Sequence, residues 1–255
     1  MKKLKIEIDE MDVDHQNQWT ANDLADMLTH QNNSQLNQNG RLTFLYPAVD
    51  HTLVKVPSSL SASDKSSWIE TQKYNPFQCK YTESHRTLYN RDDDMGSIRT
   101  SDPIPSECGI YYFEMCVLND GEDGAISIGL TSKGTNLNHQ PGWDRHTWGY
   151  HGDDGNFFEE DGGYGKKYGP MYGKDDVVGC GLNLISRSCF FTKNGKFLGV
   201  AVRNLPVIEY YPTIGVHSKD ECVEVNLGQK PFLYNIAMEK ILYNAHQKDM
   251  AKKTS

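Results

Sequence analysis

The chain has 255 residues, a formal net charge of -8 and a pI near 5.6, and 37% of its residues are hydrophobic. This length suits one large domain with tails, or two small domains, and allows a sizeable core. The acidic balance argues against a general nucleic-acid binder, which normally relies on a basic face. No stretch approaches the ~20 consecutive apolar residues of a membrane helix, so no membrane association is predicted.

Residues 1–40 are predicted to form a polar arm. The arm opens with lysines followed by acidic residues where a signal peptide has its apolar core, which favours a non-secreted, cytoplasmic protein, with the nucleus as a second location. Apolar residues at helical spacing predict a short helix over residues 21–30, and the polar run 31–40 is typical of a linker. Two interpretations stay open: a flexible extension with one nascent helix, or a segment that docks on the body or on a partner.

Residues 41–236 predict an antiparallel all-β domain, because short apolar runs alternate with Gly, Pro, Asn and Asp and no helical period is present. The clearest expected strands are 109–117, 125–131, 177–184, 188–192, 196–202, 211–216 and 222–227. Asn194-Gly195 between apolar runs predicts a tight hairpin. Many strands without helices imply two sheets packed face to face, a β-sandwich. Residues 237–255 return to helical spacing and predict a short helical tail.

The six cysteines are expected to be reduced thiols. They are scattered at Cys79, Cys108, Cys116, Cys180, Cys189 and Cys222, with no Cys-x-x-Cys pair. A chain of this size does not need disulfides, and a free thiol in an apolar run behaves as a small hydrophobe.

The order of these strands and several long sequence words resemble the SPRY domain, in the Ran-binding protein M branch. The most specific word is Gly-Trp-Asp-Arg-His-Thr-Trp-Gly-Tyr-His-Gly-Asp-Asp-Gly at residues 142–155. Matching blocks follow in order at 45–50, 97–105, 109–114, 128–130, 141–155, 168–170, 176–180, 190–195 and 211–215. The resemblance covers most of the chain, about residues 45–236. It implies a SPRY-type β-sandwich of two antiparallel sheets that acts as a protein-interaction module.

The resemblance also implies a scaffold role. Proteins of this branch resemble scaffold subunits of the CTLH/GID-type ubiquitin ligase, in which LisH and CTLH helical segments follow the SPRY domain. The present chain stops at Ser255 without such segments. A fragment, a split product and a SPRY-only adaptor are therefore all open interpretations.

Catalytic and metal sites find little support in the sequence. The histidines and aspartates around residues 139–154 lack the spacing of a ligand set, and Asp153-Asp154-Gly155 is more typical of a turn. No Gly-x-Ser-x-Gly elbow and no Cys-His arrangement appears. The glycines of 162–169 do not open a helix and so indicate a surface loop rather than a phosphate site. We expect no enzyme activity, no cofactor and no metal.

The expected partner-binding residues lie in three loops that the resemblance places at one end of the sandwich. They are Asn90, Arg91 and Asp92; Trp143, Asp144 and Arg145; and Val216, His217 and Ser218. Tyr150 is expected in the core, whereas Trp143 is open between core and contact, since Trp and Arg often dominate interfaces. Acidic runs at 92–94 and 159–161 would bias this rim toward basic partners, with solvated loops as the alternative.

The sequence thus predicts a non-catalytic scaffold or adaptor that binds a protein or peptide segment. Large multi-subunit complexes, including the ubiquitin ligase, are the expected setting. The alternative is an architectural subunit, for example cytoskeletal or ciliary, held through its arm and tail rather than through loops.

Overall fold

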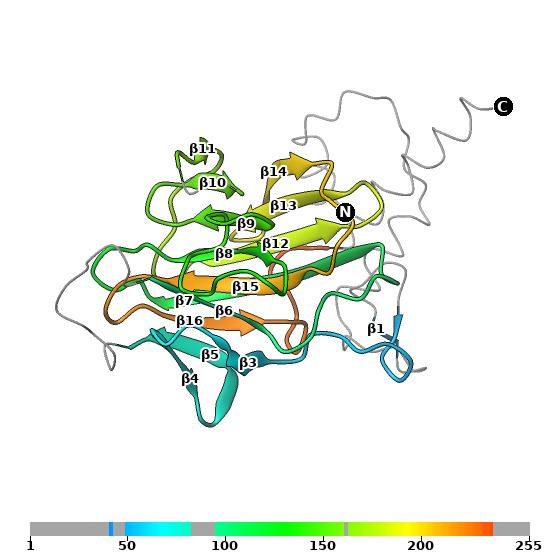
Figure 1. Cartoon of the computed structure of the whole chain (residues 1–255), viewed down its shortest axis with the longest axis horizontal. Coiled ribbons are helices and arrows are strands. Elements are labelled where there is room, and N and C mark those ends of the chain that lie inside the picture. The colour runs from blue at the N-terminus through cyan, green and yellow to red at the C-terminus, as the bar shows by residue number, and fades with distance from the viewer. Residues whose placement is uncertain (1–40, 43–48, 83–94, 161–162, 237–255) are drawn as a thin grey trace, which may run out of the picture. The chain divides into compact units, whose positions relative to one another are not determined.

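The computed structural model describes residues 41–42, 49–82, 95–160 and 163–236, and these form a two-layer β-sandwich (Figure 1). All strand pairs are antiparallel. The predicted all-β class and two-sheet architecture are confirmed. The helices predicted in the arm and the tail lie outside the described residues.

We call the first layer the β15 sheet, and its strand order is β11-β10-β9-β8-β15-β6-β3. Its strands are β3 (Leu60–Lys65), β6 (Gly96–Thr100), β8 (Ser127–Thr131), β9 (Thr147–His151), β10 (Asn156–Glu159), β11 (Lys166–Lys167) and β15 (Tyr211–Val216).

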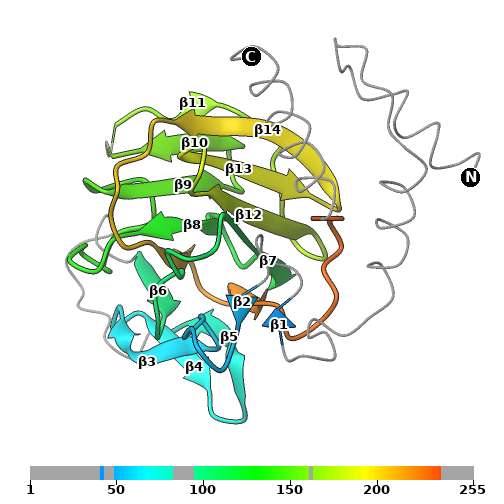
Figure 2. The same ribbon diagram turned by 90° about the vertical axis from the view of Figure 1, so that its right-hand side faces the viewer.

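We call the second layer the β7 sheet, and its strand order is β14-β13-β12-β7-β16-β5-β4. Its strands are β4 (Ile69–Gln72), β5 (Asn75–Tyr81), β7 (Ile110–Asn119), β12 (Val177–Asn183), β13 (Ser188–Lys193), β14 (Lys196–Arg203) and β16 (Cys222–Asn226). A separate small pair joins β1 (Arg41–Leu42) to β2 (Val49–Asp50), and Figure 2 shows it beside the sandwich.

The core lies between the layers and is rich in aromatic rings. Tyr150 of β9 and Phe157 of β10 contact Phe191 of β13 at ring-centroid distances of 5.5 and 5.9 Å. All three side chains are buried, as expected for Tyr150. Such rings contribute large buried areas and therefore dominate the stability of the sandwich.

The long strand β7 is buried on both faces. Tyr111 and Phe113 occupy alternate positions from Tyr112, which lies on the outer face of the β7 sheet. There Tyr112 contacts Phe232 and Tyr234 of the segment that follows β16, at 5.0 and 5.4 Å. This segment therefore covers an apolar outer face that would otherwise meet water.

The Asn194-Gly195 hairpin between β13 and β14 is confirmed. Lys193 pairs with Lys196, and Asn194 and Gly195 have φ values of 50° and 75°. Both turn positions therefore need residues that tolerate positive φ.

The direction of the strands fixes which loops share an end of the sandwich. Strand β15 begins after Tyr210 and ends before His217, and its antiparallel neighbours alternate accordingly. We call the two ends the Tyr210 end and the His217 end. The turn 217–221 and the loops 120–126, 152–155 and 171–176 lie at the His217 end. The loop 101–109, the turn 184–187 and the connection 204–210 lie at the Tyr210 end.

Candidate protein-binding surfaces

The loop between β8 and β9, residues 132–146, crosses the outer face of the β15 sheet. It starts at the Tyr210 end, where the Arg99 guanidinium donates to the carbonyls of Ser132 and Lys133, both at 2.5 Å. It then reaches the start of β6, where the Ser97 amide donates to the Leu137 carbonyl at 2.7 Å. Gln140 Nε2 finally donates to the Ala125 carbonyl at 2.5 Å, near the His217 end.

The returning part of this loop lies close against β9. A Cβ at Gly149 would come within 2.0 Å of the Pro141 carbonyl oxygen, so only glycine allows this approach. His151 Nε2 donates to the same oxygen at 2.9 Å. Burial lowers the pKa of His151, which favours the neutral ring in this position.

The loop presents the predicted Trp143, Asp144 and Arg145 in different ways. Trp143 is half-buried and packs on Phe158 of β10 at a centroid distance of 5.7 Å. Asp144 Oδ2 lies 2.9 Å from His139 Nδ1, and the Asp144 amide donates to Thr147 Oγ1 at 3.1 Å. Arg145 is exposed. Trp143 therefore packs on the sheet and also keeps surface that a partner can contact.

The predicted Val216, His217 and Ser218 also differ in exposure. Val216 is fully buried in β15, and Ser218 is 6% exposed with its hydroxyl donating to Glu221 Oε1 at 2.8 Å. His217 is half-buried, and its Nδ1 lies 3.8 Å from Asp123 Oδ2. Of these three side chains, only that of His217 offers substantial surface to a partner. The role of all three in binding stays a prediction.

The side chain of Glu221 fixes the turn 217–221 through hydrogen bonds. Its carboxylate is fully buried and accepts from the His217 amide at 2.6 Å and from the Ser218 hydroxyl. Burial raises the pKa of Glu221 to about 7, while these hydrogen bonds act in the opposite direction. The conformation of the turn is thus tied to one buried carboxyl group.

The third predicted group, Asn90, Arg91 and Asp92, lies outside the described residues, as do the acidic residues 92–94 and residue 161. The described acids of the second run are engaged locally. Glu159 pairs with Lys166 at 2.8 Å, and Glu160 accepts from the His146 amide at 3.1 Å.

A different acidic surface, which the sequence does not reveal, lies at the His217 end. A hollow of about 460 Å³ is lined there by acidic residues of three connections. The acidic residues are Asp120, Glu122, Asp123, Asp153 and Asp176. Asp120, Glu122 and Asp123 are close together in the chain, whereas Asp153 and Asp176 come from two later connections. Asp176 is paired with Lys193 at 3.0 Å, and the other acidic side chains leave the hollow with a negative charge that favours basic partners.

The remaining motif residues of 142–155 are structural in the described fold. Trp148 is buried and contacts Tyr210 at 5.6 Å. Asp154 accepts from the amide and the side chain of Asn156 at 2.8 and 2.7 Å, and Gly155 has a φ of 72°. This confirms the predicted turn.

No group of three His, Cys, Asp or Glu side chains that could hold a metal ion occurs among the described residues. Within the same part of the chain, no helix is long and apolar enough to cross a membrane. All six cysteines are free, as expected. In the predicted surface loop 162–169, Lys166 and Lys167 form the short strand β11 against β10, so this segment is more regular than its glycines indicate.

Residues 110–230 match the family model of the SPRY domain. The chain is 43% identical over 212 residues to Ran-binding protein 9 of Danio rerio, covering 83% of this chain and 34% of that protein. It is 36% identical over 182 residues to the Ran-binding protein M homolog of Arabidopsis thaliana, covering 71% and 38%. The chain thus spans about a third of the length of these relatives.

Solved structures agree with this match. A crystal structure of a human SPRY domain superposes with a TM-score of 0.54 at 27% identity, over 65% of this chain and 98% of that one. The SPRY domain of human HERC1 has the same TM-score at 16% identity, over 67% and 99%, and supports the fold alone. The similarities support a protein-interaction module rather than an enzyme. The chain therefore matches the SPRY domain over residues 110–230 and resembles the Ran-binding protein 9, 10 and M homologues.

Proposed function

We propose that this chain is a scaffold or adaptor that recognises a segment of another protein through the His217 end and the loop 132–146. The complex it serves is, by the family resemblance, a CTLH/GID-type ubiquitin ligase. The observation that carries the proposal is the fixed course of the loop 132–146. Hydrogen bonds from β6 and β9 and the ring of Phe158 in β10 hold this loop. Trp143 and Arg145 keep accessible surface.

A loop held in this way costs little conformational entropy to order when a partner binds. The two accessible side chains, Trp143 and Arg145, are of residue types that most often dominate interface energies. The acidic hollow beside His217 adds a preference for a partner segment that carries Lys or Arg.

The test is affinity purification of the full chain with mass spectrometry, comparing wild type with the double variant Trp143→Ala, His217→Ala. Loss of a Trp anchor usually weakens an interface by at least about tenfold, so partners should be lost or strongly reduced. Tyr164→Ala is the matched control, because Tyr164 is fully exposed outside these loops. Recovery of ubiquitin-ligase subunits with the wild type supports the ligase assignment, and their absence removes it.

The competing function is an architectural subunit held through the arm and the tail. Deletion of residues 1–40 separates the two proposals. If this deletion abolishes all partner binding while the double variant binds as the wild type does, the loop surface is not the binding site.

A further inference from the structure

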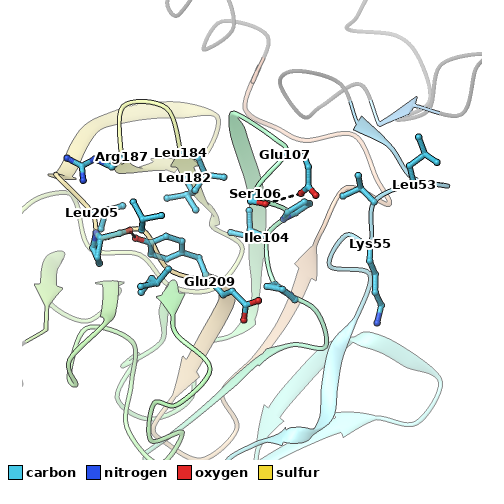
Figure 3. A pocket seen from close by; sticks show the side chains of 17 residues that line it. Leu53, Lys55, Ile104, Ser106, Glu107, Leu182, Leu184, Arg187, Leu205 and Glu209 are labelled. Atoms are coloured by element: carbon cyan, nitrogen blue, oxygen red, sulfur yellow. Dashed lines mark hydrogen bonds between the residues drawn. The ribbon is translucent and has the colours of Figure 1, made fainter.

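A second hollow, unrelated to the loops above, lies at the Tyr210 end of the sandwich (Figure 3). It has a volume of about 540 Å³. Its walls come from residues 53–55, the loop 103–107, the end of β12 with its turn, and the connection 205–210. We call it the Tyr210 groove.

The Tyr210 groove is lined mainly by aliphatic side chains and prolines. Ile104 and Leu205 are buried at its base, with exposures of 6% and 2%. Leu53 and Val207 on its walls are 82% and 88% exposed. Large aliphatic side chains left in water beside an apolar hollow mark a surface at which burial by a ligand is favourable.

The walls are held by backbone hydrogen bonds between neighbouring connections. The Ile104 amide donates to the Tyr210 carbonyl at 2.8 Å, and the Leu205 amide donates to the Arg187 carbonyl at 3.0 Å. The Leu184 amide donates to the Gly109 carbonyl at 2.8 Å. The groove is thus preformed, as ligand sites usually are.

The charges on its rim indicate what it can bind. Lys55 is neutralised by Asp102, whose Oδ1 lies 2.5 Å from Lys55 Nζ. Glu107 and Glu209 are exposed, and neither forms an ion pair with any described residue. Figure 3 shows these two carboxylates on opposite sides of Ile104, with Arg187 farther along the groove. The rim of the groove therefore carries two exposed carboxylates that no described cation pairs with, and this charge favours a basic side chain in the ligand.

The size of the groove decides between a peptide and a second copy of the chain. A stable dimer buries about 800 Å² of each partner, whereas a hollow of this volume has the dimensions of a site for a small ligand or a few side chains. We propose that the Tyr210 groove binds an extended peptide segment of another protein, with two bulky aliphatic side chains that flank a Lys or Arg. The aliphatic side chains cover Leu53 and Val207, and the cation lies between Glu107 and Glu209.

The probe is a phage-displayed library of random dodecapeptides, selected on the full chain and then measured as synthetic peptides by fluorescence polarisation. The variants Val207→Asp and Glu209→Lys change exposed side chains, so both should fold. Tyr164→Asp is the matched control, since it places the same charge on an exposed aromatic elsewhere. We expect selected peptides with aliphatic and basic residues, whose affinity falls about tenfold or more on both groove variants and stays unchanged on the control.

A charge exchange sharpens the test. A peptide in which Glu replaces the basic residue should bind Glu209→Lys better than it binds wild type. The proposal is overturned if the library yields no peptide, if selected peptides lack the aliphatic and basic pattern, or if they bind the groove variants as tightly as wild type. Peptides whose binding is lost only in the double variant Trp143→Ala, His217→Ala bind the surface of the proposed function instead. If the proposed function fails its own test, the result for the Tyr210 groove is unaffected.

Discussion

Replacing Arg99 with Met tests whether one buried ion pair fixes the loop 132–146. The Arg99 side chain is 5% exposed and binds Asp64 with two bonds, Nε to Oδ2 at 2.6 Å and Nη2 to Oδ1 at 2.8 Å. Nη1 and Nη2 also donate to the Ser132 and Lys133 carbonyls. Its guanidinium also lies 5.3 Å from the centre of the Tyr211 ring. Met keeps the length and the apolar stem of the side chain but removes every donor.

The expected loss of unfolding free energy is about 3 kcal/mol. Removing one partner of a buried ion pair costs about 3–5 kcal/mol. The lower value applies because the Asp64 side chain is 36% exposed, so water can solvate its carboxylate in the variant. The surface pair of Lys230 and Glu224, at 3.0 Å with Lys230 58% exposed, should contribute at most about 1 kcal/mol.

Urea denaturation of wild type, Arg99→Met and Lys230→Met measures the difference, and Asp64→Asn completes a double-mutant cycle. We expect a coupling energy of at least about 1 kcal/mol between Arg99 and Asp64, because the pair is bidentate. Hydrogen exchange gives an independent readout, since the Ser97 amide that donates to the loop should exchange faster in Arg99→Met. A loss no larger than that of Lys230→Met, with unchanged exchange, would refute the reasoning.

The remaining predictions concern packing, pH and thiols. Gly149→Ala should lower the unfolding free energy measured in urea by about 1–3 kcal/mol, because the added Cβ would meet the Pro141 carbonyl. Gly134→Ala, whose Cβ would have no atom within 4 Å, should change it by less than about 0.5 kcal/mol. Equal effects of the two variants would contradict this. Because folding raises the pKa of Glu221 from its ordinary 4.5 to about 7, the folded state holds an extra proton between these values, so stability should fall as pH rises from about 4.5 to 7. Glu221→Gln should flatten that slope in urea titrations at several pH values, and an unchanged slope would show that other groups cause it. Of the six thiols, only the half-buried Cys116 and Cys222 should react with a chromogenic disulfide in the native protein, and all six after unfolding; fast reaction of Cys180 or Cys189 would contradict the buried core.

The strands that carry strong apolar patterns were predictable because each is buried on at least one face. In β16, Val223 and Val225 are buried and alternate with the half-buried Glu224, as the sequence indicates. The strands β3 and β4 escaped prediction. Their sequences, Leu-Ser-Ala-Ser-Asp-Lys and Ile-Glu-Thr-Gln, are mostly polar because both strands lie at sheet edges with one face in water.

The loop 132–146 shows where local sequence stops being informative. Its glycines and aromatics predict a display loop, and Trp143 and Arg145 do keep accessible surface. That it crosses a sheet depends on groups such as Ser97 and Arg99, which lie more than 30 residues before it in the chain. Likewise, Val216 and Ser218 were expected to contact a partner but are buried. Val216 lies within β15, and Ser218 donates to the buried Glu221.

The sequence by itself determined the all-β class, the β13–β14 hairpin and the family resemblance, since these follow from periodicity, turn chemistry and long motifs that are local in the chain. Only the tertiary structure decided which loops share an end of the sandwich. It alone placed acids of three connections in one hollow and four separate connections around the Tyr210 groove. Both surfaces arise from strand order and pairing, and such long-range contacts leave no periodic signal in the residues that line them.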